Sequence, residues 1–267
     1  MFELMLKSLL FTLLLFAAPA SADVLRIGDA TNGAPLRQIQ FHAMELALSG
    51  GHDISMKRFA PSDAVNALKK NAVDLLIIEK RFLKDIPSGF QQFPYAAEAL
   101  CLYVHSDNPV GSISPQEITD ILTSVRPRWS SYTRLSSADI QRIMLKPGTS
   151  GIKLLRRSFG ELIPDREIMQ VSNIEGLFIF INNPAALGFA PFYPDYPREI
   201  ALLPVNNIAP STQTLKTGTY PLTRQYVLLC AGQPSGILLR FINTLRSLDE
   251  RRKLPEYGMI PLWEVTP

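Results

Sequence analysis

The most informative stretch of this sequence is Lys146-Pro147-Gly148-Thr149-Ser150-Gly151-Ile152. An apolar run over residues 140–145 precedes it and predicts a strand, while residues 153–159 follow it with the apolar spacing of a helix. We therefore expect the strand to end in a glycine-containing turn and a helix to begin with Ser150 as its N-cap. Strand, turn and capped helix in this order indicate an α/β unit.

The same stretch has the features of a binding site for a small oxyanion. Backbone N–H groups at a helix start lack intrahelical partners, and the helix dipole places partial positive charge there. The hydroxyls of Thr149 and Ser150 and the ammonium group of Lys146 would add donors. An ordinary glycine turn with a capping serine is the alternative, and this segment alone leaves it open. The motif is not a P-loop, because no Gly-Lys-Ser/Thr follows the first glycine.

The N-terminus predicts export. Residues 8–18 are almost wholly apolar, and Ala20-Ser21-Ala22 has the small-x-small form of a signal-peptidase site. The apolar run is shorter than the ~20 residues that a membrane span needs. We interpret residues 1–22 as a cleaved signal peptide, which predicts a mature periplasmic protein beginning at Asp23. An uncleaved N-terminal anchor is the alternative.

Composition narrows the function classes. The formal net charge is +3, and Lys and Arg are scattered among acids, so nothing favours nucleic-acid binding. The three histidines lack metal-ligand spacing, and the chain has neither a Gly-x-Ser-x-Gly elbow nor a Cys-x-x-Cys motif. We therefore expect no enzyme activity, no metal and no cofactor. Cys101 and Cys230 lie in strand-like runs, and we favour buried free thiols over a disulfide, which the sequence leaves open.

Strand-like and helix-like segments alternate along the chain. The first unit reads strand–helix–strand–helix–strand, which predicts a parallel sheet with helices on its faces; its segments are residues 24–27, a helix opened by Pro35, 54–59, 62–70 and 73–78. A second α/β unit follows a strand at 99–105; its segments are a helix capped by Ser114 and Glu117, then 140–145, the Ser150 helix, 169–171, a helix opened at 172–175, and 187–190. A strand beginning at Gln225 and helices over 235–246 and 247–253 close the chain.

The order of several short motifs resembles the periplasmic phosphate-binding proteins of ABC transporters and their wider group, the type II periplasmic solute-binding proteins. The motifs that carry the resemblance span nearly the whole mature chain; they are Ala30-Thr31-Asn32-Gly33-Ala34-Pro35-Leu36, Pro61-Ser62-Asp63 with Asn71-Ala72-Val73-Asp74, Asn108-Pro109-Val110, Lys146-x-x-x-Ser150-Gly151-Ile152, Ala185-Ala186-Leu187-Gly188-Phe189, Tyr220-Pro221-Leu222-Thr223-Arg224 and Gly258-Met259-Ile260-Pro261-Leu262.

The resemblance implies a two-lobed α/β fold in which each lobe is a mostly parallel sheet flanked by helices and the ligand lies in the cleft between the lobes. Lobe I would comprise residues 23–106 and the return 225–267, and lobe II with the hinge segments residues 107–224. The ligand-binding residues implied by the resemblance are Thr31, Asn32, Ser62, Glu79, Lys146, Thr149, Ser150 and Gly151. The protein would be a monomer that captures a small anion, with phosphate the first candidate, for an ABC permease.

The chain departs from the family pattern at three positions in these binding motifs. Lys146 stands where the family has arginine, Ile152 where it has threonine, and Glu79 where it has Asp or Ser. Plain structural interpretations also stay open: Glu79 with Lys80 and Arg81 as a solvated charged turn, Ser62 as an N-cap, and Thr31 with Asn32 as turn residues that satisfy their own backbone. The alternative function is a non-transport binding or scaffold module of the same fold that serves a sensor or envelope complex.

Overall fold

The computed structural model describes residues 23–31, 35–83, 86, 88–134, 136–146, 150–160 and 168–264, with the side chain of Leu36 and those of residues 150–153 left out. The signal-peptide prediction for residues 1–22 lies outside this part of the chain. No helix in the described part combines the length and the apolar character needed to cross a membrane.

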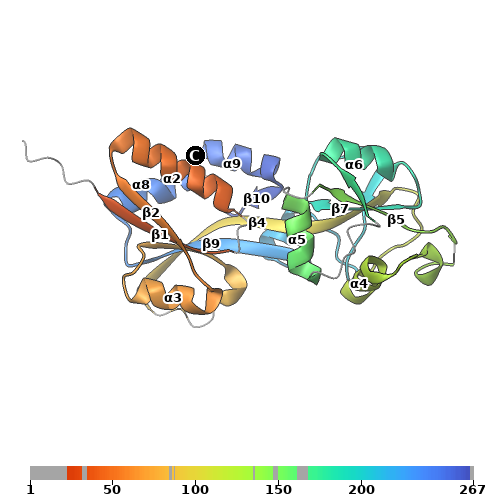
Figure 1. The fold of residues 1–267 in the computed structure, drawn as a ribbon, viewed down its shortest axis with the longest axis horizontal. Helices are drawn as coiled ribbons and strands as arrows, with labels where there is room; N and C mark the ends of the chain where they lie inside the picture. Colours follow the sequence, from red (N-terminus) through yellow and green to blue (C-terminus); the bar gives the residue numbers. More distant parts are fainter. Residues whose placement is uncertain are drawn as a thin grey trace, which may run out of the picture.

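One mixed sheet runs through the molecule in the order β2-β1-β3-β9-β4-β7-β5-β6, and β8 and β10 pair with β4 (Figure 1). Its strands are β1 (Val24–Ala30), β2 (Asp53–Arg58), β3 (Leu75–Glu79), β4 (Phe90–His105), β5 (Gln141–Leu145), β6 (Met169–Val171), β7 (Ala186–Pro191), β8 (Ile200–Leu202), β9 (Thr223–Ala231) and β10 (Met259–Pro261). β1 pairs in parallel with β2 and β3, as the strand–helix alternation predicts, and β5 pairs in parallel with β6 and β7.

Helices cover these strands in both halves of the molecule (Figure 1). They are α2 (Leu36–Gly50), α3 (Pro61–Lys69), α4 (Pro115–Thr123), α5 (Ser150–Phe159), α6 (Ile174–Ile181), α7 (Thr212–Thr217), α8 (Gly236–Leu245) and α9 (Leu248–Lys253), with short 3₁₀ turns η1 (Lys80–Phe82), η2 (Trp129–Ser131) and η4 (Leu254–Tyr257). The prediction of a two-lobed α/β architecture is confirmed, although β4, β8, β9 and β10 make the sheet mixed.

β4 is far longer than expected. It spans sixteen residues, whereas the sequence predicts a strand only over 99–105. Its first part pairs with β9 and β10, and its last residues pair with β7 and β8, so this strand passes from one half of the molecule to the other. The register shifts between Pro94 and Ala96, because proline has no N–H to give to the ladder. The glutamines and proline of this first part explain why the sequence did not predict it.

Two helix starts test the capping predictions. At α4 the Ser114 hydroxyl accepts a bond from Glu117 N at 3.2 Å, and the Glu117 carboxylate accepts one from Ser114 N at 2.6 Å, so the predicted capping box is confirmed. At α3 the N-cap is Ala60, and Pro61 occupies the first helical turn. The interpretation of Ser62 as an N-cap is therefore wrong, since proline fixes the helical φ one residue earlier.

The described residues form three buried apolar clusters, one in the second half and two in the first. In the second half, residues such as Trp129, Leu155 and Phe189 are fully buried, and in the first half Leu25, Tyr95 and Phe241 are. Cys101 and Cys230 each lie in a core as free thiols, which confirms the preferred interpretation. Burial raises the pKa of both thiols, so neither has the thiolate character of a reactive cysteine.

A buried polar cluster joins α2, α9 and β4. His42 Nε2 lies 2.7 Å from Glu250 Oε2, His42 Nδ1 lies 3.1 Å from Glu45 Oε2, and the Tyr95 hydroxyl donates to Glu250 Oε1 at 3.0 Å. The bond to Glu250 raises the pKa of His42 against the opposing effect of burial, with Glu45 adding to the rise. Protonated His42 therefore holds the N-terminal helix against a C-terminal one.

We predict that His42→Gln costs about 2 kcal/mol of unfolding free energy in mild acid. Because the folded-state pKa of His42 is raised, its stabilisation is fully present below its ordinary pKa of about 6.5 and is lost as pH rises through the folded-state pKa. Urea unfolding of wild type and His42→Gln between about pH 5.5 and 8.5 measures this difference. His105→Gln is the matched control, because this histidine contacts neither glutamate. A difference that stays constant with pH would reduce His42 to a packing role.

Candidate functional site

Strand ends bring the predicted site residues to two edges of the sheet. β1, β2 and β3 run parallel, so Thr31, the first turn of α3 and Glu79 follow strand ends that share one edge. β5, β6 and β7 run parallel in the other half, where Lys146 and Ser172 follow strand ends. Carboxyl ends of parallel strands are where α/β sheets place ligands.

Several predicted residues have described environments, and others do not. Thr31 is buried, and its hydroxyl and N–H both donate to Asp29 Oδ1, at 2.6 and 3.0 Å, which is a turn arrangement. Ser62 and Lys146 are exposed. Asn32 and Thr149 lie outside the described residues. Ser150 is the first residue of α5, so the helix begins one residue earlier than its prediction as the N-cap implies; the side-chain environments of Ser150 and Gly151 lie outside that description.

Glu79 is buried and paired, which a solvated turn does not explain. Its Oε1 lies 2.8 Å from Arg81 Nε and its Oε2 3.5 Å from Arg224 Nη1. Burial raises the pKa of Glu79, while Arg224, Arg81 and Arg157 oppose the rise. The solvated-turn interpretation holds for Lys80 and Arg81, which are exposed, and is wrong for Glu79.

The pairing of Glu79 continues into a buried network between α5 and the sheet. Arg224 Nη2 donates to the backbone oxygen of Arg157 at 2.6 Å, and Arg157 Nη1 donates to Glu98 Oε1 at 3.2 Å. The Tyr226 hydroxyl donates to the same oxygen of Glu98. Burial raises the pKa of Glu98, and the bonds from Tyr226 and the charges of Arg157 and Arg224 oppose that rise. The sequence analysis assigned no role to Glu98, Arg157 or Tyr226, since only tertiary structure joins them.

A pocket of about 580 Å³ lies on one side of this network. Its charged lining comprises Glu79 and four cations, namely Lys80, Arg81, Arg157 and Arg224. Ser158, Thr217 and Thr223 add hydroxyls, and the buried Thr223 Oγ1 has no hydrogen-bond partner among the described residues. An excess of cations together with a free hydroxyl suits an anion.

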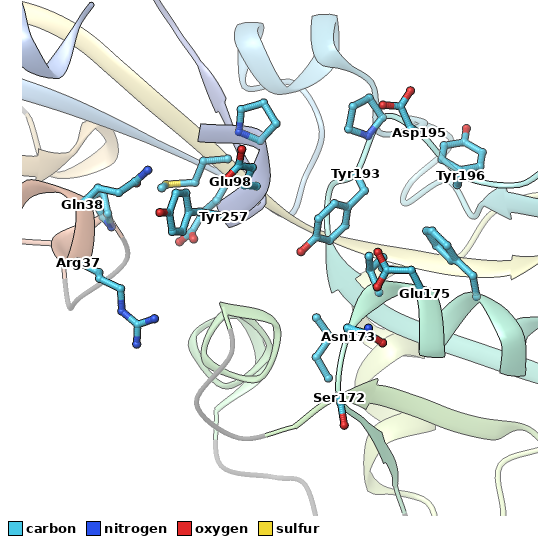
Figure 2. Close-up of a pocket in the computed structure, with 18 of the residues that line it drawn as sticks. Arg37, Gln38, Glu98, Ser172, Asn173, Glu175, Tyr193, Asp195, Tyr196 and Tyr257 are labelled. Atoms are coloured by element: carbon cyan, nitrogen blue, oxygen red, sulfur yellow. The ribbon is translucent and has the colours of Figure 1, made fainter. Parts of the chain in front are cut away.

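A larger cleft of about 980 Å³ lies between the two halves (Figure 2). Its walls come from the first turn of α2, the start of α6, the segment after β7 and the η4 turn; they include Pro35, Arg37, Gln38, Glu98, Arg157, Ser172, Asn173, Glu175, Phe178, Tyr193, Asp195, Tyr196, Glu256 and Tyr257. Asn173 caps α6 by accepting a bond from Gly176 N at 3.0 Å. Thr31, Ser62 and Lys146 line neither cavity, Glu79 lines only the smaller one, and Arg157 lines both. The described residues contain no group of His, Cys, Asp and Glu that could hold a metal ion.

We predict that Arg157→Met destabilises the protein by about 3–5 kcal/mol, because it leaves the buried Glu98 carboxylate without its cation. The double variant Arg157→Met/Glu98→Gln should recover part of that loss. Urea unfolding of the two single variants and the double variant gives the coupling energy. Additivity within about 0.5 kcal/mol would show that the pair is not coupled.

Comparison with known proteins places the chain in a family. The family model described as PBP superfamily domain matches residues 61–247. The chain is similar to the phosphate-binding protein PstS of Bacillus subtilis (strain 168), with 23% identity over 175 residues, which are 64% of this chain and 57% of that protein.

Solved structures agree with the fold. A possible phosphate binding protein from Planctomyces limnophilus DSM 3776 matches with a TM-score of 0.67 at 14% identity, covering 91% of this chain and 94% of that one. PstS from Borrelia burgdorferi matches with a TM-score of 0.62 at 14% identity, covering 91% of this chain and 100% of that one. An ABC-type phosphate transport receptor from Vibrio cholerae matches with a TM-score of 0.58 at 17% identity, covering 88% of this chain and 99% of that one. The chain therefore belongs to the PBP superfamily and has the two-lobed type II periplasmic-binding-protein fold.

Proposed function

We propose that this protein is a periplasmic solute-binding protein that captures a small oxyanion, phosphate first, and delivers it to an ABC permease. The observation that carries this proposal is the pocket around Glu79, in which four cations accompany a single carboxylate. Such a cavity attracts anions by its local charge although the chain as a whole is only weakly basic. The relatives are named binding proteins, and we propose that this chain likewise binds and releases a solute without transforming it.

The proposed contacts are Thr31, Asn32, Ser62, Glu79, Lys146, Thr149, Ser150 and Gly151. Glu79 lines the cationic pocket, parallel strand ends support the other contacts in each half, and α5 begins at Ser150, four positions after Lys146. The corresponding lobes are residues 23–106 with 225–267, and 107–224. Closing the lobes on an anion would remove it from water and strengthen these contacts.

Affinity should be modest. Lys146 offers a point charge where an arginine would offer a two-pronged donor, and Ile152 offers no hydroxyl. Glu79, Arg224 and Arg157 already satisfy one another or Glu98 inside the protein. This internal pairing is the specific observation that favours the second candidate, a non-transport module of the same fold that serves a sensor or envelope complex.

We predict that phosphate binds more tightly than sulfate and that Glu79→Gln narrows the difference. Monohydrogen and dihydrogen phosphate carry an O–H group that can donate a hydrogen bond to the Glu79 carboxylate. Ionised sulfate has no O–H group, so the Glu79 carboxylate only repels it. We expect about tenfold discrimination in the wild type, equal to about 1.4 kcal/mol. Isothermal titration calorimetry of both anions at about pH 7 measures it, with melting curves to establish that the variant is folded.

Glu199→Gln is the matched control, since Glu199 is exposed and is not among the lining residues of either cavity. Equal affinity for sulfate and phosphate in the wild type would remove the discriminating role of Glu79. If neither anion binds, the transport proposal fails and the non-transport module takes its place.

Export and monomeric state belong to the same proposal. We expect the periplasmic protein to begin at Asp23 after cleavage of residues 1–22. N-terminal sequencing of the periplasmic fraction checks this, and a membrane-retained chain that still begins at Met1 would contradict it.

A further inference from the structure

A buried amide without partners lies in the larger cleft. Gln38 is only 6% exposed, and neither its Nε2 nor its Oε1 has a hydrogen-bond partner among the described residues. It lines the cleft from the first turn of α2, across from the α6 side (Figure 2). Keeping an amide buried and unsatisfied destabilises the protein, so such a group at the wall of a cleft points to a ligand that completes its hydrogen bonds.

The lining of this cleft contains more aromatic and apolar side chains than a bare inorganic anion would use. Three tyrosines and Phe178 contribute rings, and four prolines add apolar faces; these residues are Tyr193, Tyr196, Tyr257, Pro35, Pro194, Pro197 and Pro255. The cleft volume of about 980 Å³ lies in the range of roughly 300–1,000 Å³ typical of sites for organic ligands. The lining therefore favours a solute with an organic part.

The charges that line the cleft indicate that the organic part of the solute carries a cation. Glu175, Asp195 and Glu256 are exposed carboxylates in the lining and form no ion pair within the described part of the chain. The lining contains two cations, Arg37 and Arg157, and Arg157 is paired internally with Glu98. Burial raises the pKa of the Tyr193 phenol, and the negative charge of nearby Glu175 raises it further. Carboxylates beside tyrosine rings form a suitable environment for an ammonium group.

We propose that the larger cleft is a subsite for a protonated amine carried on the organic part of the captured solute, which makes the ligand an amino-phosphomonoester rather than inorganic phosphate. The Gln38 Oε1 accepts an N–H of the ammonium group, and its Nε2 donates to an oxygen of the organic part. The Tyr193 ring and the Glu175 carboxylate, which lie across the cleft from Gln38, attract the same charge (Figure 2). Only the phosphate end of this ligand rests on the proposed function.

The test is a titration of the full mature chain with four probes at about pH 7: O-phosphoethanolamine, glycerol 3-phosphate, inorganic phosphate and ethanolamine. We expect O-phosphoethanolamine to bind about tenfold more tightly than glycerol 3-phosphate, which shares the ester and lacks the amine. Glu175→Gln should reduce this preference several-fold, and Glu199→Gln should leave it unchanged. Gln38→Leu should raise the melting temperature of the ligand-free protein and weaken O-phosphoethanolamine binding, because it removes an unsatisfied amide that the ligand needs.

The outcomes separate this inference from the proposed function. Equal affinity for the three phosphate-bearing probes overturns the amine subsite and retains the proposed function. Ethanolamine binding as tightly as O-phosphoethanolamine supports the amine subsite and overturns capture of an oxyanion. A Gln38→Leu variant with a lower melting temperature and unchanged affinity makes Gln38 structural and overturns its role here. If no probe binds, both proposals fail.

Discussion

The structure depends on one long strand with a carboxylate in its middle. β4 belongs to both halves of the sheet, and its residues from Tyr95 to Val104 are buried without interruption. Glu98 lies in that buried run, where an unpaired carboxylate would be strongly unfavourable. Tyr226 from β9 and Arg157 from α5 both bind it, so the cost of burying Glu98 is offset by groups from both sides of the cleft. This contact fixes α5 against the sheet, and with it the wall that the two cavities share.

The two cavities differ in chemistry although Arg157 lines both. The smaller one gathers cations around Glu79, and the larger one gathers tyrosines, prolines and carboxylates. Arginine suits the shared position, because its planar group can bind a carboxylate while its stem covers apolar surface. The smaller cavity therefore offers mainly positive charge to a ligand, and the larger one offers carboxylates and aromatic rings.

Local patterns in the sequence predicted the order of elements well, and tertiary pairing explains what they missed. β6 was predicted at its observed bounds, and the capping box of Ser114 and Glu117 marked the start of α4, because these signals act within a few residues. The first part of β4 and the short strands β8 and β10 were not predicted, because they exist only by pairing with distant partners. The same holds for the site. Glu79 was found as a strand-end residue, whereas Glu98 and Arg157 are separated by 59 positions and meet only in the fold.

Family membership fixes the scaffold more firmly than the ligand. Lys146 after β5 and Ile152 within α5 offer fewer directed donors than the arginine and threonine of the family pattern. Positive charge near Glu79 comes instead from η1, α5 and β9, which are ordered elements of the framework. Charges on ordered elements are already oriented before a ligand arrives, so binding requires little reorganisation of them. Internal ion pairs, however, already neutralise part of this positive charge. A ligand must then gain its affinity elsewhere. Within the described part of the chain, the Gln38 amide on one wall of the larger cleft lacks hydrogen-bond partners, and the same lining adds aromatic rings and carboxylates.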